Sequence, residues 1–285
     1  MNAPPLTYAF QPNEKTKEGF MRILGEIAAQ GNELTRAPSS PMEQSIHKGR
    51  LLIKRLRALL WFARPVLDEA SYVCAKTELR NAAGLLGGHR DLAVARATLE
   101  KLKKKTSKLS VREAVAQTLR KMALDKVAGK EADEKLRRSL GEAMGLVSRT
   151  IEAVKKNAAE GKTWPTPPER LAKAYRAQIK AGKLARQTGD DNDFHTWRKK
   201  AKRLLYQLEL SQPVPGKKAS KAMKRVEQLQ EKLGEYHDDI VVETRLNEQA
   251  LATPSAKCVL KSLDKQKTHL RKKAHKIALR VKTKI

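Results

Sequence analysis

The sequence predicts an all-α protein built from two similar halves. Ala, Leu, Lys, Glu, Arg and Gln dominate its 285 residues, and runs that alternate apolar with polar residues, as half-buried strands do, are missing. A basic motif also occurs twice, 148 positions apart (195 minus 47): HKGRLLIKRLRA begins at His47 and HTWRKKAKRLLY at His195. The composition predicts the fold class, and the repeated motif predicts the two halves.

Apolar residues at helical spacing predict the elements in order. The expected helices lie at roughly 13–30, 42–65, 68–86, 89–105, 109–127, 131–157, 168–188, 192–211, 217–235, 237–251 and 255–283. Segment 157–168 (NAAEGKTWPTPP) holds a glycine and three prolines, which end a helix, so we expect a linker there. This linker divides a single domain, 1–285, into a first half at 8–157 and a second half at 168–283.

A second pair of segments supports the repeat. LLGGHRDLAV (85–94) matches KLGEYHDDIV (232–241), each about forty residues after its basic motif. Each copy predicts a helix that ends at Leu-Gly and a further helix opened by an aspartate, Asp91 or Asp238. Capping of backbone amides is the favoured role for both aspartates.

The net charge points to a polyanionic partner. Sixty Lys and Arg face 31 Asp and Glu, a formal charge of +29. Such an excess destabilises a compact chain by self-repulsion unless a polyanion or counterions offset it. Nucleic acid, an anionic membrane or a phosphate polymer would all fit, and a generally solvated basic surface is the alternative.

On both motif helices, basic residues share one face and apolar residues share the other. The basic faces hold His47, Arg50, Lys54 and Arg57 in the first copy, and His195, Arg198, Lys199 and Lys202 in the second. No acidic residue interrupts 44–67 or 194–208 to relieve the repulsion. A row of phosphates would relieve it, since Arg forms forked hydrogen bonds to phosphate oxygens and Lys adds a point charge. Whether His47 and His195 contact the ligand or orient the neighbouring Arg stays open.

The sequence does not support a secreted, membrane-spanning or disulfide-rich protein. The first residues have neither the basic nor the apolar region of a secretory signal, and no stretch approaches the roughly 18 apolar residues of a membrane span. Cys74 and Cys258 form no CxxC, so neither a disulfide framework nor a cysteine metal site is expected. We therefore expect a soluble, cytoplasmic protein.

Signatures of enzymes are missing too. The sequence has no GxxxxGK[ST], GxGxxG or HExxH motif. The triplet His237-Asp238-Asp239 suggests a metal only weakly, because its counterpart, His89-Arg90-Asp91, places Arg where a cation would sit. We expect no catalytic residue, no metal and no cofactor.

Nucleic acid is the main rival ligand. Proteins that bind single strands usually offer aromatic platforms in a basic groove. Aromatic residues make up only 4% of this chain, and Trp61, Trp164 and Trp197 are scattered. The sequence thus has means of holding phosphates and few means of distinguishing bases.

The doubled motif resembles a known family. HxxRxxxKRL, followed by a Leu-Gly and an Asp, in two halves, is similar to the CHAD domain (conserved histidine α-helical domain), and FHTWRKKAKRLLYQLEL (194–210) is especially similar to its second half. The resemblance covers roughly 8–283. It implies two pseudo-symmetric helical bundles around a basic central cavity, and binding of inorganic polyphosphate, often at intracellular polyphosphate granules, without catalysis.

The resemblance also implies the ligand-facing residues. These are His47, Arg50, Lys54, Arg55 and Arg57 in the first half, His195, Arg198, Lys199, Lys202 and Arg203 in the second, and Arg90, Tyr175, Arg176 and Lys180 as weaker members. The chain departs from a strict repeat where Leu205 matches Arg57 and His237 matches Arg90. Some relatives carry a triphosphate-hydrolysing domain with an ExExK motif, which this sequence lacks.

The expected function is therefore polyphosphate binding by a free-standing helical module. Two alternatives remain: a basic helical protein that binds nucleic acid, and an enzyme acting on polyphosphate or a nucleotide.

Overall fold

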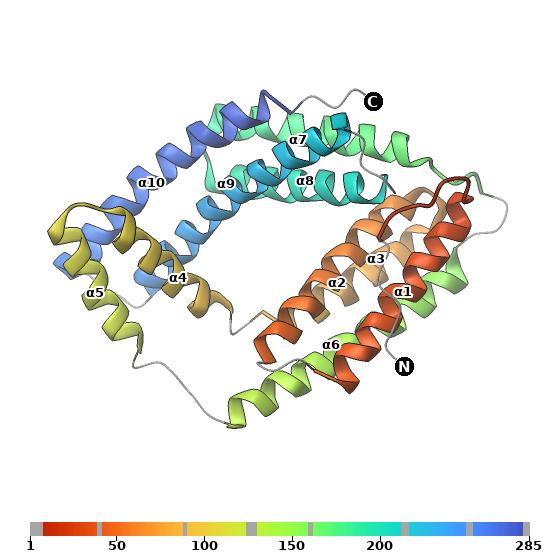
Figure 1. Ribbon diagram of the computed structural model, residues 1–285, viewed down its shortest axis with the longest axis horizontal. Coiled ribbons are helices and arrows are strands. Elements are labelled where there is room, and N and C mark those ends of the chain that lie inside the picture. Colours follow the sequence, from red (N-terminus) through yellow and green to blue (C-terminus); the bar gives the residue numbers. More distant parts are fainter. Residues whose placement is uncertain are drawn as a thin grey trace.

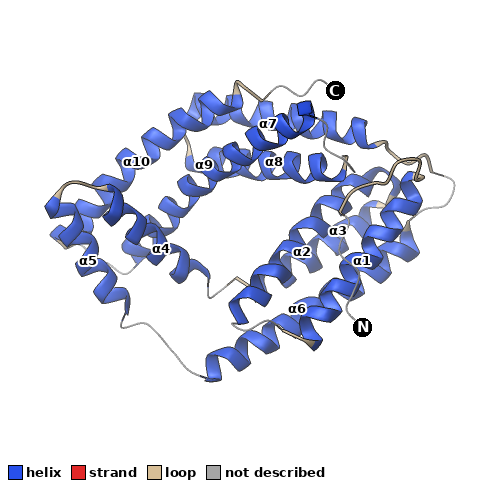
Figure 2. Ribbon diagram, in the orientation of Figure 1, coloured by secondary structure: helices blue, strands red, loops and turns tan. Residues whose placement is uncertain are grey.

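The computed structural model describes residues 8–38, 42–87, 90–123, 130–158, 162–211, 217–248 and 253–281. These ranges form ten α-helices and one short 3-10 helix, and they contain no strand (Figure 2). The elements are α1 (Thr16–Arg36), α2 (Met42–Ala63), η1 (Arg64–Val66), α3 (Glu69–Leu85), α4 (Arg90–Lys105), α5 (Leu109–Ala123), α6 (Lys130–Asn157), α7 (Pro167–Thr188), α8 (Asp191–Leu210), α9 (Lys217–Glu248) and α10 (Pro254–Ala278). The predicted all-α class is confirmed. In this described part, no helix is both long and apolar enough to cross a membrane.

Helix α7 begins and ends at residues with well-defined local roles. The Thr166 side chain accepts a hydrogen bond from the backbone of Glu169, and the Glu169 carboxylate accepts one from the backbone of Thr166. This reciprocal capping box satisfies amides that would otherwise lack partners at a helix start. Gly189 follows the last turn in the left-handed conformation, with φ of 66°. The predicted linker thus lies between the end of α6 and this capped start.

One predicted boundary is wrong. The helices expected at 217–235 and 237–251 form a single helix, α9, which continues through Gly234. One glycine inside a helix costs only about 1 kcal/mol, and packing of α9 against α8, α10 and α4 outweighs that cost. Asp238 therefore lies inside a helix, and its predicted capping role is wrong as well. Asp91 is the second residue of α4, but its side chain lies outside the described part.

Helices α1, α2, α3 and α6 pack together as a first bundle. Phe20, Leu56, Phe62 and Leu79 are at most 1% exposed in its core. Helices α7, α8, α9 and α10 form a second bundle around Trp197, which is fully buried. The apolar faces predicted for the two motif helices, built on Leu56 and Leu204, are the buried faces.

Helices α4 and α5 pack on each other and on the second half of the chain, away from the core of the first bundle. They lie against α9 and α10, where Leu99 and Val115 share an apolar cluster with Val242 and Leu263. Figure 1 shows this pair beside one end of α9 and α10. The chain leaves the first bundle after α3, contacts the second half with α4 and α5, and returns with α6.

The two bundles meet where α2 and α8 end. Trp61 of α2 lies in an apolar cluster with Leu204 and Leu208 of α8. In the opposite direction, Tyr206 and Leu210 of α8 belong to the core cluster of the first bundle. Each motif helix therefore places side chains in the core of the other half.

Candidate anion-binding surface

The basic face of α2 runs along a helix whose opposite side is buried. His47 and Arg57 are exposed, and Arg50 and Lys54 are half-buried. The Arg50 guanidinium donates a hydrogen bond to the carbonyl of Leu86, just after α3. This bond holds Arg50 against the end of α3, so its position is fixed before any ligand arrives.

The basic face of α8 has the same pattern. Lys199 is exposed, and His195, Arg198 and Lys202 are half-buried. The Gln230 side chain of α9 donates to the carbonyl of Arg198 at 3.1 Å, which fixes this turn of α8 against its neighbour. The structure thus gives both motif helices a partly accessible row of cations.

His195 lies beside His237 of α9, with ring centroids 5.1 Å apart. Burial lowers the pKa of His195, and the charges of Lys199 and Arg198 lower it further. Because the ordinary value is about 6.5, a lowered pKa leaves the ring neutral at pH 7. A neutral His195 donates a hydrogen bond from only one nitrogen. The sequence did not predict that His237 lies beside His195.

Arg55 and Arg203, which match in the repeat, both lie at the junction of the bundles. The Arg55 Nε lies 3.6 Å from the Glu209 carboxylate, and its guanidinium stands over the Tyr8 ring at 5.2 Å. The Arg203 guanidinium stands over the Trp61 ring at 4.8 Å. Arg55 therefore has an acidic partner inside the protein, which its place in the motif did not reveal.

Further arginines gather around Arg203. Burial lowers the pKa of Arg203, and the charges of Arg57 and Arg64 contribute to this shift. Arg170 stands 3.9 Å from the centroid of the Trp61 ring and is only 4% exposed. Burial, together with the charge of Arg203, lowers the pKa of Arg170 to about 10, so it still carries its charge at pH 7. We call Arg57, Arg64, Arg170 and Arg203 the junction arginines.

Acidic groups near the junction arginines are few. Arg64 pairs with Glu69 at 3.3 Å, and Glu169 adds a weak favourable effect at Arg170. Neither Arg57 nor Arg203 has a carboxylate partner among the described residues. Arg64 and Arg170 were not predicted, because they lie outside the motif and contact it only through the tertiary fold.

The weaker predicted members have different surroundings. The Tyr175 hydroxyl donates to the carbonyl of Val281 at 2.9 Å, so it ties α7 to the chain after α10. Arg176 and Lys180 are exposed on α7. Arg90 opens α4, and its side chain lies outside the described part. The contacts therefore point to a structural use of Tyr175.

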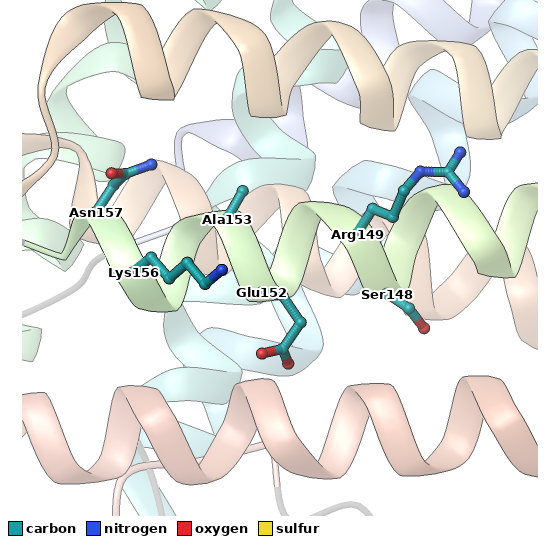
Figure 3. A pocket seen from close by; sticks show the side chains of 6 residues that line it. All are labelled: Ser148, Arg149, Glu152, Ala153, Lys156 and Asn157. Atoms are coloured by element: carbon teal, nitrogen blue, oxygen red, sulfur yellow. The ribbon is translucent and has the colours of Figure 1, made fainter.

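Among the described side chains, no group of three His, Cys, Asp or Glu is placed to hold a metal ion. Asp239 is fully buried and accepts hydrogen bonds from Gln266 at 2.8 and 3.1 Å. A hollow on α6 is lined by six residues of that helix alone, and the Arg149 and Glu152 side chains point to different sides of the helix (Figure 3). No second element contributes to that hollow, so it defines no site.

The fold and this surface define an all-helical protein with two basic helices that meet between two bundles. The chain belongs to the CHAD domain family, because the family model matches residues 20–247. A solved structure, the CHAD domain from the plant Ricinus communis, is similar over 97% of this chain and 91% of that chain, with 19% sequence identity and a TM-score of 0.62. At this identity the likeness shows the fold alone. Comparison with curated proteins gave no match.

Proposed function

We propose that this protein binds inorganic polyphosphate along the basic faces of α2 and α8, without hydrolysing it. The CHAD family is linked to polyphosphate binding in general. The observation that carries the proposal for this chain is the convergence of cations from both motif helices at one junction, where Arg57 of α2 is close enough to Arg203 of α8 for its charge to lower the pKa of Arg203. Like charges held this close repel, and a chain of phosphates that touches both helices offsets the repulsion.

Polyphosphate suits this surface better than nucleic acid does. Trp61, at the junction where α2 and α8 meet, is 7% exposed and covered by Arg170 and Arg203. Trp197 is fully buried. Neither ring offers a free face on which a base can stack, whereas guanidinium and ammonium groups need only phosphate oxygens.

Competition at one fixed salt concentration tests the proposal. Labelled long-chain polyphosphate is bound to the protein and displaced by RNA, DNA or unlabelled polyphosphate, compared per phosphate. We expect unlabelled polyphosphate to displace the label at concentrations at least about tenfold lower than either nucleic acid. Equal or better displacement by RNA or DNA would favour the nucleic-acid alternative.

Two further assays address the remaining parts of the proposal. Phosphate release from polyphosphate or nucleoside triphosphates should stay at the level of a protein-free control, and sustained release would make the protein an enzyme. In cells, a fluorescent fusion should gather at cytoplasmic polyphosphate granules and disperse when polyphosphate synthesis is removed.

A further inference from the structure

A basic hollow lies on the outer side of the second bundle. It occupies about 500 Å³ between the end of α7, the start of α8 and the last turns of α10. Arg186, Arg271, Lys272, His275 and Lys276 line it, and none of its nine lining residues is acidic. We call this hollow the α10 groove.

The α10 groove is separate from the basic face of α8. Phe194, which lines the groove, and Trp197, which lies behind it, are on the buried side of α8. Lys199 and Lys202 of the basic face point about 160° and about 140° away from Trp197, because each residue advances by about 100°. None of the residues that line the groove belongs to the basic face of α8. Figure 1 shows α7 and α10 on the outer side of α8. A ligand in the groove would therefore not touch the face that α8 contributes to the proposed polyphosphate surface.

Arg271 is held in place before any ligand binds. Its Nε and Nη2 donate to the Tyr236 hydroxyl at 3.0 and 2.6 Å, and Nη2 also donates to Asp191 at 3.0 Å. Its guanidinium stands over the Phe194 ring at 5.2 Å. Across the groove, a Cβ at position 189 would come within 3.7 Å of the Arg271 Nη1, so Gly189 leaves that nitrogen less covered. Fixed donors lose little entropy when they bind an anion.

The other cations of the groove have fewer acidic neighbours than Arg271 has. Asp191 offsets part of the charge of Arg271, but Lys272 and Lys276 are exposed one turn apart on α10, and Arg186 is exposed on α7. Cations one helical turn apart repel each other. An anion between α7 and α10 would contact both helices and remove this repulsion.

His275 is the group in the groove that responds to charge. Its ring stacks on Trp197 with centroids 4.8 Å apart and planes 23° apart. Burial lowers the pKa of His275, and the charge of Arg186 lowers it further. A bound anion favours the protonated ring and raises this pKa. His275 therefore reports occupancy of the groove.

We propose that the α10 groove is a second phosphate-binding site, which takes a phosphoryl group or a short phosphate chain independently of α2 and α8. Several ammonium and guanidinium donors around one hollow suit the multiple oxygens of phosphate better than the two oxygens of a single carboxylate. Inorganic phosphate and the terminal unit of a phosphate chain share this chemistry. A protein with two such sites can hold two phosphate chains, or two parts of one chain.

The test follows the imidazole NMR signals of His275 while triphosphate or inorganic phosphate is added. The chain has six histidines, and the His275→Gln variant assigns the signal. We expect saturating triphosphate to raise the pKa of His275 by about one unit, the size expected for an opposite charge at close range. A shift with inorganic phosphate as well assigns a site for a single phosphoryl group, and a shift with triphosphate alone assigns a site for a chain.

Variants separate this site from general charge and from the proposed function. Lys272→Gln with Lys276→Gln should raise the triphosphate concentration needed for the His275 shift about tenfold or more. Lys261→Gln with Lys265→Gln, an exposed pair on the same helix with the same spacing, should leave it unchanged. The shift should also survive Lys54→Gln, Arg57→Gln, Lys199→Gln and Lys202→Gln together, even if polyphosphate does not bind at α2 and α8. No shift at saturating triphosphate, or an equal effect of the two lysine pairs, would overturn the proposal.

Discussion

The Arg203 guanidinium stands 4.8 Å above the ring of Trp61, and this contact has a counterpart on the other side of the junction. There, Arg55 lies 3.6 Å from Glu209. Arg55 and Arg203 are 148 positions apart (203 minus 55), and so are Trp61 and Glu209 (209 minus 61). Arg55 of the first half therefore contacts Glu209 of the second, and the matching Arg203 of the second half contacts the matching Trp61 of the first. Such reciprocal contacts are typical of an interface with two-fold symmetry. One target is aromatic and the other acidic, so the correspondence is positional rather than chemical.

The first prediction concerns this junction. Trp61→Ala should lower the free energy of unfolding by about 3–5 kcal/mol, because it removes a 7%-exposed ring from an apolar cluster and leaves Arg170 and Arg203 without their stacking partner. Urea unfolding measures the change. Trp164→Ala is the control, since Trp164 is only partly buried against Phe20. An equal or smaller loss for Trp61→Ala would show that the junction contributes little to stability.

The second prediction concerns pH. Burial raises the pKa of Asp239 to about 7, and the charges of Asp238 and Glu235 act in the same direction. The folded protein therefore binds a proton that the unfolded chain releases near pH 4. Between about pH 4 and 7, this group makes stability fall as pH rises, by up to about 1.4 kcal/mol per pH unit.

Asp239→Asn isolates this effect, because the amide does not titrate. The free energy of unfolding of the wild type minus that of the variant should fall as pH rises from 5 to 7. Urea unfolding at several pH values measures this difference. A difference that stays flat would mean that Asp239 is already ionised throughout this range in the folded protein, and the predicted raised pKa would be wrong.

The third prediction concerns ligand-linked stability. A ligand that binds only the folded state stabilises it by about 2.7 kcal/mol at one hundred times its Kd. Long-chain polyphosphate should therefore raise the melting temperature, and by less in the variant Lys54→Gln with Arg57→Gln. Differential scanning calorimetry measures both shifts. An unchanged wild-type melting temperature at saturating polyphosphate would argue against binding to the folded state.

The fourth prediction concerns salt. Each Lys or Arg that meets a phosphate releases roughly one counterion, so the logarithm of the affinity should fall linearly with the logarithm of salt concentration. Lys54→Gln with Arg57→Gln should reduce this slope by about two. Lys135→Gln with Arg138→Gln on α6, a matched exposed pair, should leave it unchanged. Affinity that does not vary with salt would remove the electrostatic basis of the proposal.

Local sequence patterns correctly predicted the features that depend on neighbouring residues, namely helices and their buried faces. Helical spacing and an apolar face identified α2 and α8 together with their buried sides, because amphipathic periodicity directly reflects burial. The prolines of segment 157–168 likewise indicated the break between α6 and α7. The helix boundary predicted before Asp238 was wrong, because one glycine weakens a helix by less than tertiary packing can restore.

Contacts between the two halves could not be predicted from the sequence, because they depend on how the bundles pack together. Nothing near Arg55 along the chain indicates that Glu209 lies beside it, and Arg170 reaches Trp61 from a helix more than one hundred residues away. The packing of α4 and α5 on α9 and α10 could not be predicted either, because the apolar face of a helix does not show which helix it packs against.

The central claim is that the basic faces of α2 and α8 hold one phosphate chain together. Its most direct test compares the affinity for long-chain polyphosphate with that for triphosphate, in a Lys272→Gln, Lys276→Gln background that weakens the α10 groove. When one ligand spans both faces, the second contact is effectively intramolecular, so loss of either face costs a long chain more than a short one. We expect a variant of either face to weaken long-chain binding at least about tenfold more than triphosphate binding. The α2 variant is Lys54→Gln with Arg57→Gln, and the α8 variant is Lys199→Gln with Lys202→Gln. The control on α6, Lys135→Gln with Arg138→Gln, should change neither affinity. If the α6 pair weakened long-chain binding as much as either motif pair, binding would depend on total charge, and the shared surface of α2 and α8 would be contradicted.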